Sequence, residues 1–515
     1  MEEIDQRDNK IVTWLKENWI LTAILIIALV LRLFFFQATV MQGQTSWWDS
    51  AEYLSIGLHY SDGTPYMVSP IRPPLFQYML AGLISAGATE WFMILLLTLL
   101  PSVFVIYCIY LLVKEILGKR AGLISAFFAA VSWNFIFWSN RAQPDFISLA
   151  VQVLAIYFFW KMMAVKDDPP EDSTWDSEKL GTAKKLRTKY AMIAAAYAAF
   201  GFYFKISALL IPLGLAIFVL IKDRLSAFAK KEYWIYLVTY IGCFIPYMVW
   251  AWISFKNILP ILVPYSDQII RDTAYGWGTL AFFNIFGLQW MFWIFLVGMI
   301  ATLKVFLYLD IIAKDKEKAF DYRILVITFI LLMLAFFVFY IRAIEDRWIF
   351  LLLPFMCLVC ASILESLCKF FDGKDLRWVG VVIVIGLLMG TAYEQVTYGK
   401  ILLDQKKGSY MEVKQAAEWM ASNSRTSDII MSISYPQTVW YSKRHVETYS
   451  TMDVTTFEEY LNEHHPLYVT VSVFEPHPQW IYEWTLDSNN AVPVNAYYQD
   501  VAQTQPTLII YQLQY

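Results

Sequence analysis

Two acidic side chains lie in the aromatic segment 47–53, directly after the first long apolar run of the chain. Asp49 and Glu52 are three residues apart, so a helix through this segment would place both carboxylates on one face. Asp145 follows a later apolar run that is predicted to end at the same side of a membrane. Carboxylates at a membrane edge are costly and usually functional. Two of them at one cavity suggest chemistry on a lipid-linked substrate.

A cation follows in the same loop. Arg72 stands before Pro73 and Pro74, directly ahead of an apolar helix, so its backbone has little freedom. A fixed guanidinium at headgroup level is suited to bidentate phosphate binding. Structural alternatives stay open, because Arg72 could extend to lipid headgroups and Asp49 could cap an interfacial helix.

Two further short loops, 140–145 and 344–348, carry both signs of charge. Their candidate cations are Arg141 and Arg347. Local salt bridges or helix caps could explain either loop alone. Together with the acids and Arg72 of the first loop, they predict a cluster of carboxylates and guanidiniums at one membrane face.

These loops must be positioned by membrane-spanning helices. The chain has 515 residues, of which 58% are hydrophobic and 16% charged, against about 25% charged residues in an ordinary soluble protein. The composition indicates a polytopic α-helical membrane protein with about eleven spans, each near the 18 to 20 apolar residues that cross a bilayer. The predicted spans are 19–37, 91–113, 121–139, 146–163, 189–204, 206–221, 233–254, 280–303, 324–341, 348–368 and 378–396.

Lysine and arginine in alternate loops set the expected orientation. The N-terminus is predicted to be cytoplasmic, with 1–18 preceding a retained signal-anchor helix, and residues 166–189 are read as a solvated cytoplasmic linker. An odd number of spans then places 397–515 outside the cell or in an equivalent lumen. The basic loops are 114–120, 161–189, 222–231, 304–323 and 369–377.

Cysteine usage and charge exclude other classes. All five cysteines fall in predicted spans, so disulfides are not expected. Cys357 and Cys360 have a CxxC spacing, but without a nearby histidine they are read as packing residues rather than a metal site. The net charge of −4 gives no reason to expect a nucleic-acid partner.

The C-terminal stretch 397–515 reads as a small α/β domain, distinct from the transmembrane domain 1–396 with its long outer loop 38–90 and interfacial helices. A mainly parallel sheet is expected, and the histidines are too irregularly spaced for a metal signature. The predicted helices are 413–420 and 455–461, and the predicted strands are 428–433, 467–473, 492–498 and 507–513.

The chain resembles the GT-C glycosyltransferases that use polyprenyl-phosphate sugars, a group that includes protein O-mannosyltransferases and lipid A aminoarabinose transferases. Four motifs carry the resemblance in order. They are an acidic motif after the first span (Asp49, Glu52, Tyr53), a basic residue before a double proline (Arg72), an Arg-x-x-x-Asp loop (Arg141, Asp145) and an Arg-aromatic start to a late span (Arg347, Trp348). The likeness covers the first 160 residues or so by motif and the rest by topology.

The resemblance implies an inverting transfer of a monosaccharide from a polyprenyl-phosphate donor to a hydroxyl of a protein, lipid or glycan acceptor, outside the plasma membrane. It implies that Asp49 is the general base and that Arg72 and Arg347 hold the lipid phosphate. Asp145 would position the acceptor or orient Arg141, while Glu52 and Tyr53 would contact donor or acceptor. The chemistry agrees, since a phosphate leaving group needs cations more than a strong acid. No cofactor is expected, and a divalent metal stays open.

Two features depart from the family pattern: Ser50 separates Asp49 from the next acid, and an arginine stands where Lys or His is more common. Two alternatives remain. An oligosaccharyltransferase of the same fold would explain the sequence Trp47-Trp48-Asp49, although that motif belongs in the outer domain of such enzymes. A lipid-linked glycan flippase or transporter would share the many spans, but it usually shows internal repeats and charges at the midplane.

Overall fold

The computed structural model of the protein describes residues 13–165, 177–260, 287–304, 317–341, 346–487, 490–499 and 502–515. These form two compact units. The first comprises the described residues up to Phe35, with Thr98–Ser139 and Pro144–Leu402. The second comprises Phe36–Leu97, Asn140–Gln143 and Leu403–Tyr515. Part of the predicted linker at 166–189, the start of the predicted span at 280–303, and Glu345 lie outside the described residues.

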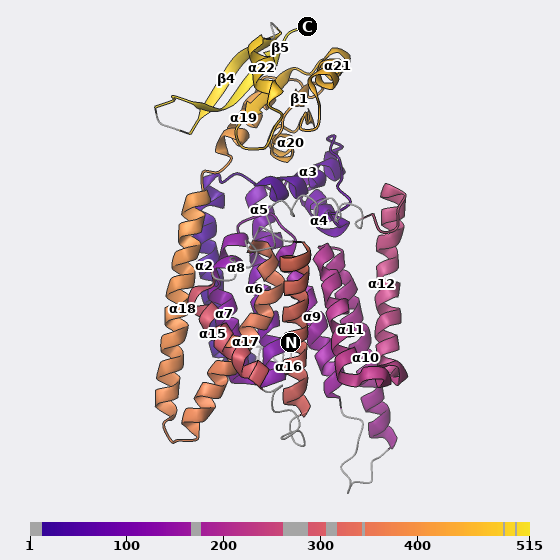
Figure 1. The fold of residues 1–515 in the computed structure, drawn as a ribbon, viewed down its shortest axis with the longest axis vertical. Coiled ribbons are helices and arrows are strands. Elements are labelled where there is room, and N and C mark those ends of the chain that lie inside the picture. The colour runs from indigo at the N-terminus through magenta and orange to yellow at the C-terminus, as the bar shows by residue number, and fades with distance from the viewer. Residues whose placement is uncertain are drawn as a thin grey trace, which may run out of the picture. The chain divides into compact units, whose positions relative to one another are not determined.

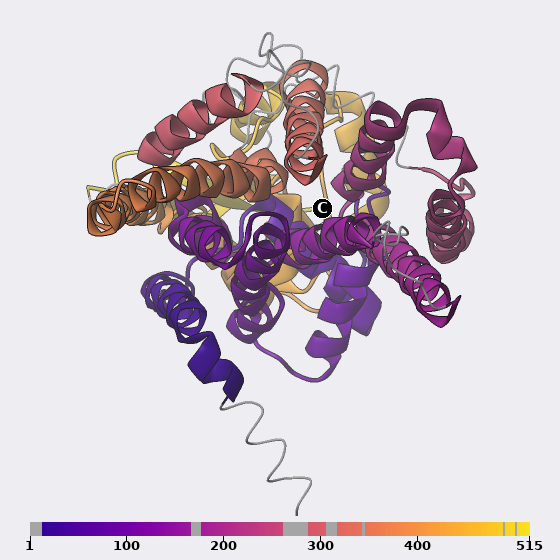
Figure 2. The same ribbon diagram turned by 90° about the horizontal axis from the view of Figure 1, so that it is seen from below.

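Long apolar helices build the first unit, and many run alongside one another (Figures 1 and 2). The central helix is α17, which packs against α7, α9, α15 and α16. The helices are α2 (Trp19–Ala38), α6 (Leu100–Leu117), α7 (Lys119–Val131), α8 (Trp133–Trp138), α9 (Asp145–Ala164), α10 (Ser177–Phe202), η3 (Ile206–Leu209), α11 (Leu210–Asp223), η4 (Arg224–Ala229), α12 (Lys231–Phe255), α15 (Gln289–Lys304), α16 (Glu317–Met333), η7 (Leu334–Tyr340), η8 (Asp346–Trp348), α17 (Ile349–Asp372) and α18 (Arg377–Lys406).

Among the described residues, eight helical segments are long and apolar enough to cross a membrane. The predicted spans at 121–139, 189–204 and 280–303 are not among them, so the expected number of about eleven is not confirmed. The segment 121–139 is broken at Ser132 into α7 and α8, and the helix α10 already begins at Ser177, inside the predicted linker. The part of the predicted linker from Ser177 on is therefore helical, and most of its described residues up to Lys189 are exposed or half-buried.

A buried arginine stabilises the break between α7 and α8. Arg32 of α2 is fully buried; its Nε atom donates to the Ser102 hydroxyl at 2.8 Å, and its Nη1 atom donates to the Ala130 carbonyl at 3.0 Å. Carbonyls in the last turn of a helix lack intrahelical partners. Because α7 ends at Val131, Arg32 satisfies one of these carbonyls and fastens α7 to α2 and α6.

The second unit combines the long first loop with the C-terminal domain. The loop forms η1 (Val40–Gln42), α3 (Trp48–Asp62) and α4 (Pro74–Ser85), followed by α5 (Glu90–Ile94) and η2 (Leu95–Leu99). The helix α3 ends on Gly63, whose φ of 81° favours glycine. Pro74 at the first position of α4 has a φ already suited to a helix.

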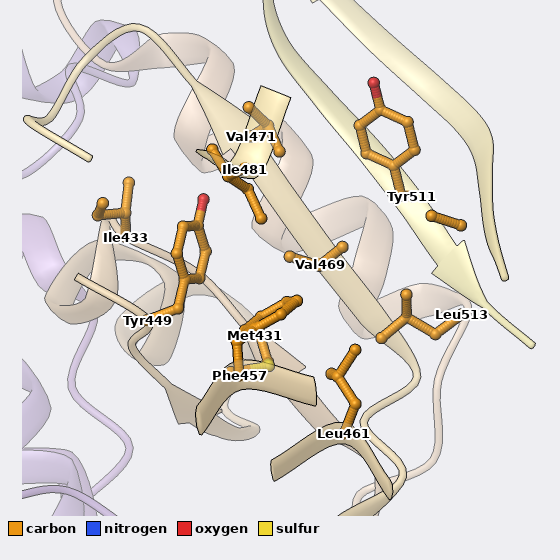
Figure 3. Close-up of a cluster of buried hydrophobic side chains, with 11 residues drawn as sticks. Met431, Ile433, Tyr449, Phe457, Leu461, Val469, Val471, Ile481, Tyr511 and Leu513 are labelled. Atoms are coloured by element: carbon orange, nitrogen blue, oxygen red, sulfur yellow. The ribbon is translucent and has the colours of Figure 1, made fainter. Parts of the chain in front are cut away.

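The C-terminal domain is an α/β domain, as expected. Its core holds side chains from the central strand β3 (Tyr468–Ser472), the neighbouring strand β5 (Pro506–Leu513) and the helix α21 (Val454–His464) (Figure 3). The buried Tyr449 hydroxyl donates to the Thr470 carbonyl at 2.7 Å. Its elements are α19 (Met411–Ser422), β1 (Ile429–Met431), α20 (Tyr435–Ser442), β2 (His445–Glu447), α21 (Val454–His464), β3 (Tyr468–Ser472), α22 (Trp480–Asp487), β4 (Ala491–Tyr498) and β5 (Pro506–Leu513).

The sheet has the strand order β2-β1-β3-β5-β4. The strand β1 is parallel to β2 and β3, whereas β5 is antiparallel to β3 and β4. The expectation of a mainly parallel sheet is therefore wrong, because the last two strands pair as antiparallel neighbours. The four predicted strands are present, and the short strand β2 was not predicted.

Candidate functional site

The first turn of α3 and the loop before α4 form an ion cluster. The Nη2 atom of Arg72 lies 2.6 Å from Oδ1 of Asp49 and 2.6 Å from Oε2 of Glu52. The three-residue spacing of the acids places both carboxylates on one side of α3, as the sequence predicted. Pro73 follows Arg72 and favours an extended backbone at Arg72. The Arg72 carbonyl accepts a 3.1 Å hydrogen bond from the side-chain amide of Gln77.

The cluster carries more negative than positive charge, since two carboxylates face one guanidinium. Burial lowers the pKa of Arg72, but the charges of Asp49 and Glu52 more than offset this, so the pKa is raised well above its ordinary value. Arg72 is therefore a permanent cation. It holds both carboxylates in place on an otherwise apolar part of α3.

Aromatic side chains flank the cluster. The Tyr53 hydroxyl lies 3.3 Å from Nη1 of Arg72, and the guanidinium carbon is 4.8 Å from the Tyr53 ring centroid. Burial and then the charge of Glu52 raise the pKa of Tyr66, whose ring stacks on Tyr435 at 4.8 Å. Sequence reasoning missed Tyr66 and Tyr435, because their proximity depends on contact between the first loop and α20.

Arg141 belongs to the same unit as this cluster. It is 2% exposed, and its guanidinium carbon lies 3.8 Å from the Trp47 ring centroid. This is close cation–π geometry. Trp47, the residue that Arg141 contacts, stands two positions before Asp49 in the first loop. The second unit thus holds Asp49, Glu52, Tyr53, Arg72 and Arg141.

Asp145 lies in the first unit, in the first turn of α9. Its carboxylate forms an ion pair with Lys205, and its side chain is 4% exposed. Lys205 stands in the turn between α10 and η3, where the sequence predicted only a tight connection. A lysine between two apolar helices indicates that the lysine has an acidic partner. The sequence alone could not identify this partner as Asp145, which is 60 residues away.

Arg347 also lies in the first unit, in η8. Its guanidinium carbon is 5.0 Å from the Trp138 ring centroid. The neighbouring Asp346 accepts hydrogen bonds through Oδ2 from the Trp138 indole at 3.3 Å and from Asn134 at 3.4 Å. The short helix α8 therefore supports both charged residues of η8, and sequence reasoning missed it by predicting one unbroken span.

Within the described part of the chain, no three His, Cys, Asp or Glu side chains gather in a way that could hold a metal ion. What the described residues offer is ion pairing, an ionisable base and permanent cations. These are the parts that a proton transfer beside a phosphate leaving group requires.

Comparison with known proteins identifies the fold. Residues 71–170 match the family of dolichyl-phosphate-mannose-protein mannosyltransferases. No curated protein matches the chain.

Solved structures match along nearly the whole chain. ArnT from Cupriavidus metallidurans bound to undecaprenyl phosphate has a TM-score of 0.64 and 11% identity, covering 96% of this chain and 98% of ArnT. The oligosaccharyltransferase AglB from Archaeoglobus fulgidus, in complex with an inhibitory peptide and a dolichol-phosphate, has a TM-score of 0.57 and 14% identity. That match covers 97% of this chain and 76% of AglB.

At these identities the matches establish architecture. ArnT and AglB are polyprenyl-phosphate-dependent glycosyltransferases of the GT-C type. The resemblance stated from the sequence motifs is confirmed, and the chain is an integral membrane protein with the GT-C glycosyltransferase fold.

Proposed function

We propose that this protein is an inverting glycosyltransferase that moves a monosaccharide from a polyprenyl-phosphate donor to a hydroxyl acceptor. The observation that carries the proposal is the ion cluster of Asp49, Glu52 and Arg72, on a chain with the GT-C fold. In the proposed step, Asp49 takes the proton of the acceptor hydroxyl while that oxygen bonds to the anomeric carbon. The bond from this carbon to the phosphate oxygen breaks, and the polyprenyl phosphate leaves with the electron pair.

Arg72 has two tasks in this proposal. Before the donor binds, it pairs with both Asp49 and Glu52 at 2.6 Å. When the donor phosphate arrives, the guanidinium turns part of its donor set toward the phosphate, which frees an oxygen of Asp49 for the acceptor proton. The charge that develops on the leaving phosphate is then stabilised by a cation already in place.

The roles of the remaining residues follow the family resemblance. Arg347 is assigned to the donor phosphate, Asp145 and Arg141 to positioning the acceptor, and Glu52 and Tyr53 to contacts with donor or acceptor. The protein is proposed to lie in the plasma membrane with a cytoplasmic N-terminus. A catalytic transmembrane domain, 1–396, would then precede an extracytoplasmic domain, 397–515.

The test is an assay for release of polyprenyl phosphate. Purified protein is incubated with polyprenyl-phosphate monosaccharides and candidate hydroxyl acceptors, beside the variants Asp49→Asn and Asp62→Asn. Asp62 is a matched control, because it is an exposed acid at the other end of α3. Asp49→Asn should fold and bind donor but lose about 10²- to 10⁴-fold in turnover, as expected for a missing general base.

Three other results of this assay would contradict the proposal or replace it with another function. Normal transfer by Asp49→Asn would refute the assignment of the base. Transfer of lipid-linked oligosaccharides to an acceptor peptide, without transfer of any monosaccharide, would favour an oligosaccharyltransferase, the function of AglB. Absence of transfer with every donor, together with movement of a labelled lipid-linked sugar across vesicles, would replace the proposal with a flippase.

A further inference from the structure

The start of α3 is fastened to the C-terminal domain by a small polar network. The backbone N–H of Ser46 donates to the Tyr441 hydroxyl at 2.8 Å, and the Ser46 hydroxyl donates to Oε1 of Glu90 at 2.7 Å. The other oxygen of Glu90 accepts the indole N–H of Trp440 at 2.8 Å. We call Ser46, Glu90, Trp440 and Tyr441 the Glu90 latch.

The latch joins three separate parts of the second unit. Ser46 precedes α3, Glu90 begins α5, and Trp440 and Tyr441 lie on α20. Trp440 is 8% exposed. A partly buried carboxylate that accepts bonds from three different donors fixes those donors relative to one another, because losing any bond costs more away from water.

The helix α20 also holds the first loop beyond Asp49. The buried Ser55 hydroxyl of α3 donates to the Pro436 carbonyl at 2.8 Å. The backbone N–H of Met67 donates to the Tyr435 hydroxyl at 3.2 Å, next to the stacked rings of Tyr66 and Tyr435. Contacts from α20 therefore bracket Asp49, with Ser46 three residues before it and Ser55 six residues after it.

Arg72 is held by other means. Its backbone N–H donates to the Ser69 carbonyl at 3.1 Å, and its carbonyl accepts from Gln77. The loop that bears Arg72 contacts α20 through Tyr66 and Met67, but the backbone of Arg72 itself is bonded to Ser69 and to Gln77 of α4. Loosening the latch should displace Asp49 more than Arg72.

We propose that α20 of the C-terminal domain positions the general base, and that Glu90 and Trp440 are positioning residues for Asp49. This inference rests on the proposed function, in which Asp49 takes the acceptor proton. Neither residue belongs to the ion cluster itself. A displacement of a catalytic group by about 1 Å can cost about 10²-fold in rate, so a latch three residues from the base is close enough to matter.

The decisive comparison uses two tryptophans of one domain in the full-length protein. Trp440→Phe keeps an aromatic ring but removes the N–H that donates to Glu90. Trp484→Phe is the matched control, because its indole donates to Oε1 of Glu458 at 3.1 Å and makes no contact with the latch. Donor titrations give kcat and KM, and hydrogen exchange reports the protection of amides 46–52.

Trp440→Phe should lower kcat by about 10- to 100-fold, with donor KM changed less than about twofold and faster exchange at 46–52. Trp484→Phe should match the wild type in all three measurements. Ser55→Ala, which removes the contact with Pro436, should shift kcat in the same direction as Trp440→Phe. Equal kcat and equal exchange in Trp440→Phe and Trp484→Phe would overturn the proposal.

The exchange measurement separates this inference from the proposed function. If the wild type transfers no sugar, the proposed function fails, and protection of 46–52 still tests whether α20 holds the start of α3. If the wild type transfers sugar and Trp440→Phe exchanges faster with unchanged kcat, the latch is structural and the positioning role is refuted.

Discussion

Oδ1 of Asp49 lies 2.6 Å from Nη2 of Arg72, so the proposed base is paired with the cation assigned to the donor phosphate. An ion pair of this kind keeps a carboxylate ionised and oriented, but it also occupies Oδ1, one of the two oxygens that could accept a proton. In the proposed mechanism, donor binding and release of the base would therefore be coupled through one guanidinium. The order of events would be donor first and proton transfer second.

Arg72→Lys tests this coupling. A lysine ammonium is a single point charge and cannot present the planar fork that reaches two carboxylates and a phosphate. We expect donor KM to rise by about 10-fold, with a smaller change in kcat, because lysine cannot make the bidentate hydrogen bonds that a guanidinium makes to a phosphate. Steady-state titration with donor measures both constants.

The control for Arg72→Lys is Arg425→Lys on the surface of the C-terminal domain. Both constants should stay at wild-type values in that control. If Arg72→Lys also left donor KM unchanged, Arg72 would serve only to hold Asp49 and Glu52, and phosphate binding would have to be assigned elsewhere.

The ion pair of Asp145 and Lys205 yields a second prediction. Lys205→Met leaves a nearly buried carboxylate without its cation, which costs about 3 kcal/mol or more in comparable buried pairs. The double variant Asp145→Asn with Lys205→Met should recover much of this loss. Thermal unfolding of the two single variants and the double variant in detergent gives the coupling energy.

Activity separates the two roles that Asp145 could have. Recovered stability together with recovered turnover in the double variant would make the pair purely structural. Recovered stability without turnover would favour the assignment of Asp145 to the acceptor. A Lys205→Met protein as stable as the wild type would contradict the ion pair itself.

The sequence predicted local features of the site better than its long-range contacts. The shared face of Asp49 and Glu52 follows from helical spacing, and Arg72 is restricted by the prolines after it. Lys205 could not be paired with Asp145, because no local period links residues 60 positions apart.

In the sheet, too, sequence reasoning found strands with a clear local pattern and was less successful with how the strands pair. The strands β1 and β3 have β-branched or apolar patterns that sequence reasoning finds, whereas β2 has a single apolar residue, Val446, between His445 and Glu447. The antiparallel pairing of β4 with β5 could have been predicted. The connection between Tyr498 and Pro506 is too short for the crossover that parallel strands require.

Trp138 provides a third prediction, at Arg347. The ring centroid lies 5.0 Å from the guanidinium carbon, and the indole donates to Asp346. Trp138→Phe keeps a weaker aromatic face, whereas Trp138→Leu removes both interactions. If Arg347 binds donor phosphate, donor KM should rise from the wild type to Trp138→Phe and again to Trp138→Leu. The total loss of donor binding free energy should not exceed the roughly 0.5 to 2 kcal/mol that a cation–π contact contributes.

The control for this series is Trp133→Phe and Trp133→Leu in the same helix, because Trp133 is equally buried but contacts Tyr398 instead of Arg347. A rise in donor KM of the same size in both series would mean that α8 as a whole, and not the contact with Arg347, affects donor binding.

Glu475 is expected to make the stability of the C-terminal domain depend on pH. Burial raises the pKa of this carboxyl, and the Tyr410 hydroxyl offsets the rise only in part. A carboxyl whose pKa is higher in the folded state contributes stability that is complete below its unfolded pKa of about 4.3 and is lost as the pH rises through the folded value. Glu475→Gln removes the ionisable group, so this loss cannot occur in the variant.

Thermal unfolding should therefore give Glu475→Gln a higher melting temperature than the wild type near neutral pH, and the difference should shrink toward about pH 4. The exposed Glu459→Gln serves as the control and should show no such trend. A difference that stayed constant with pH would mean that the change acts through packing rather than through the charge of Glu475.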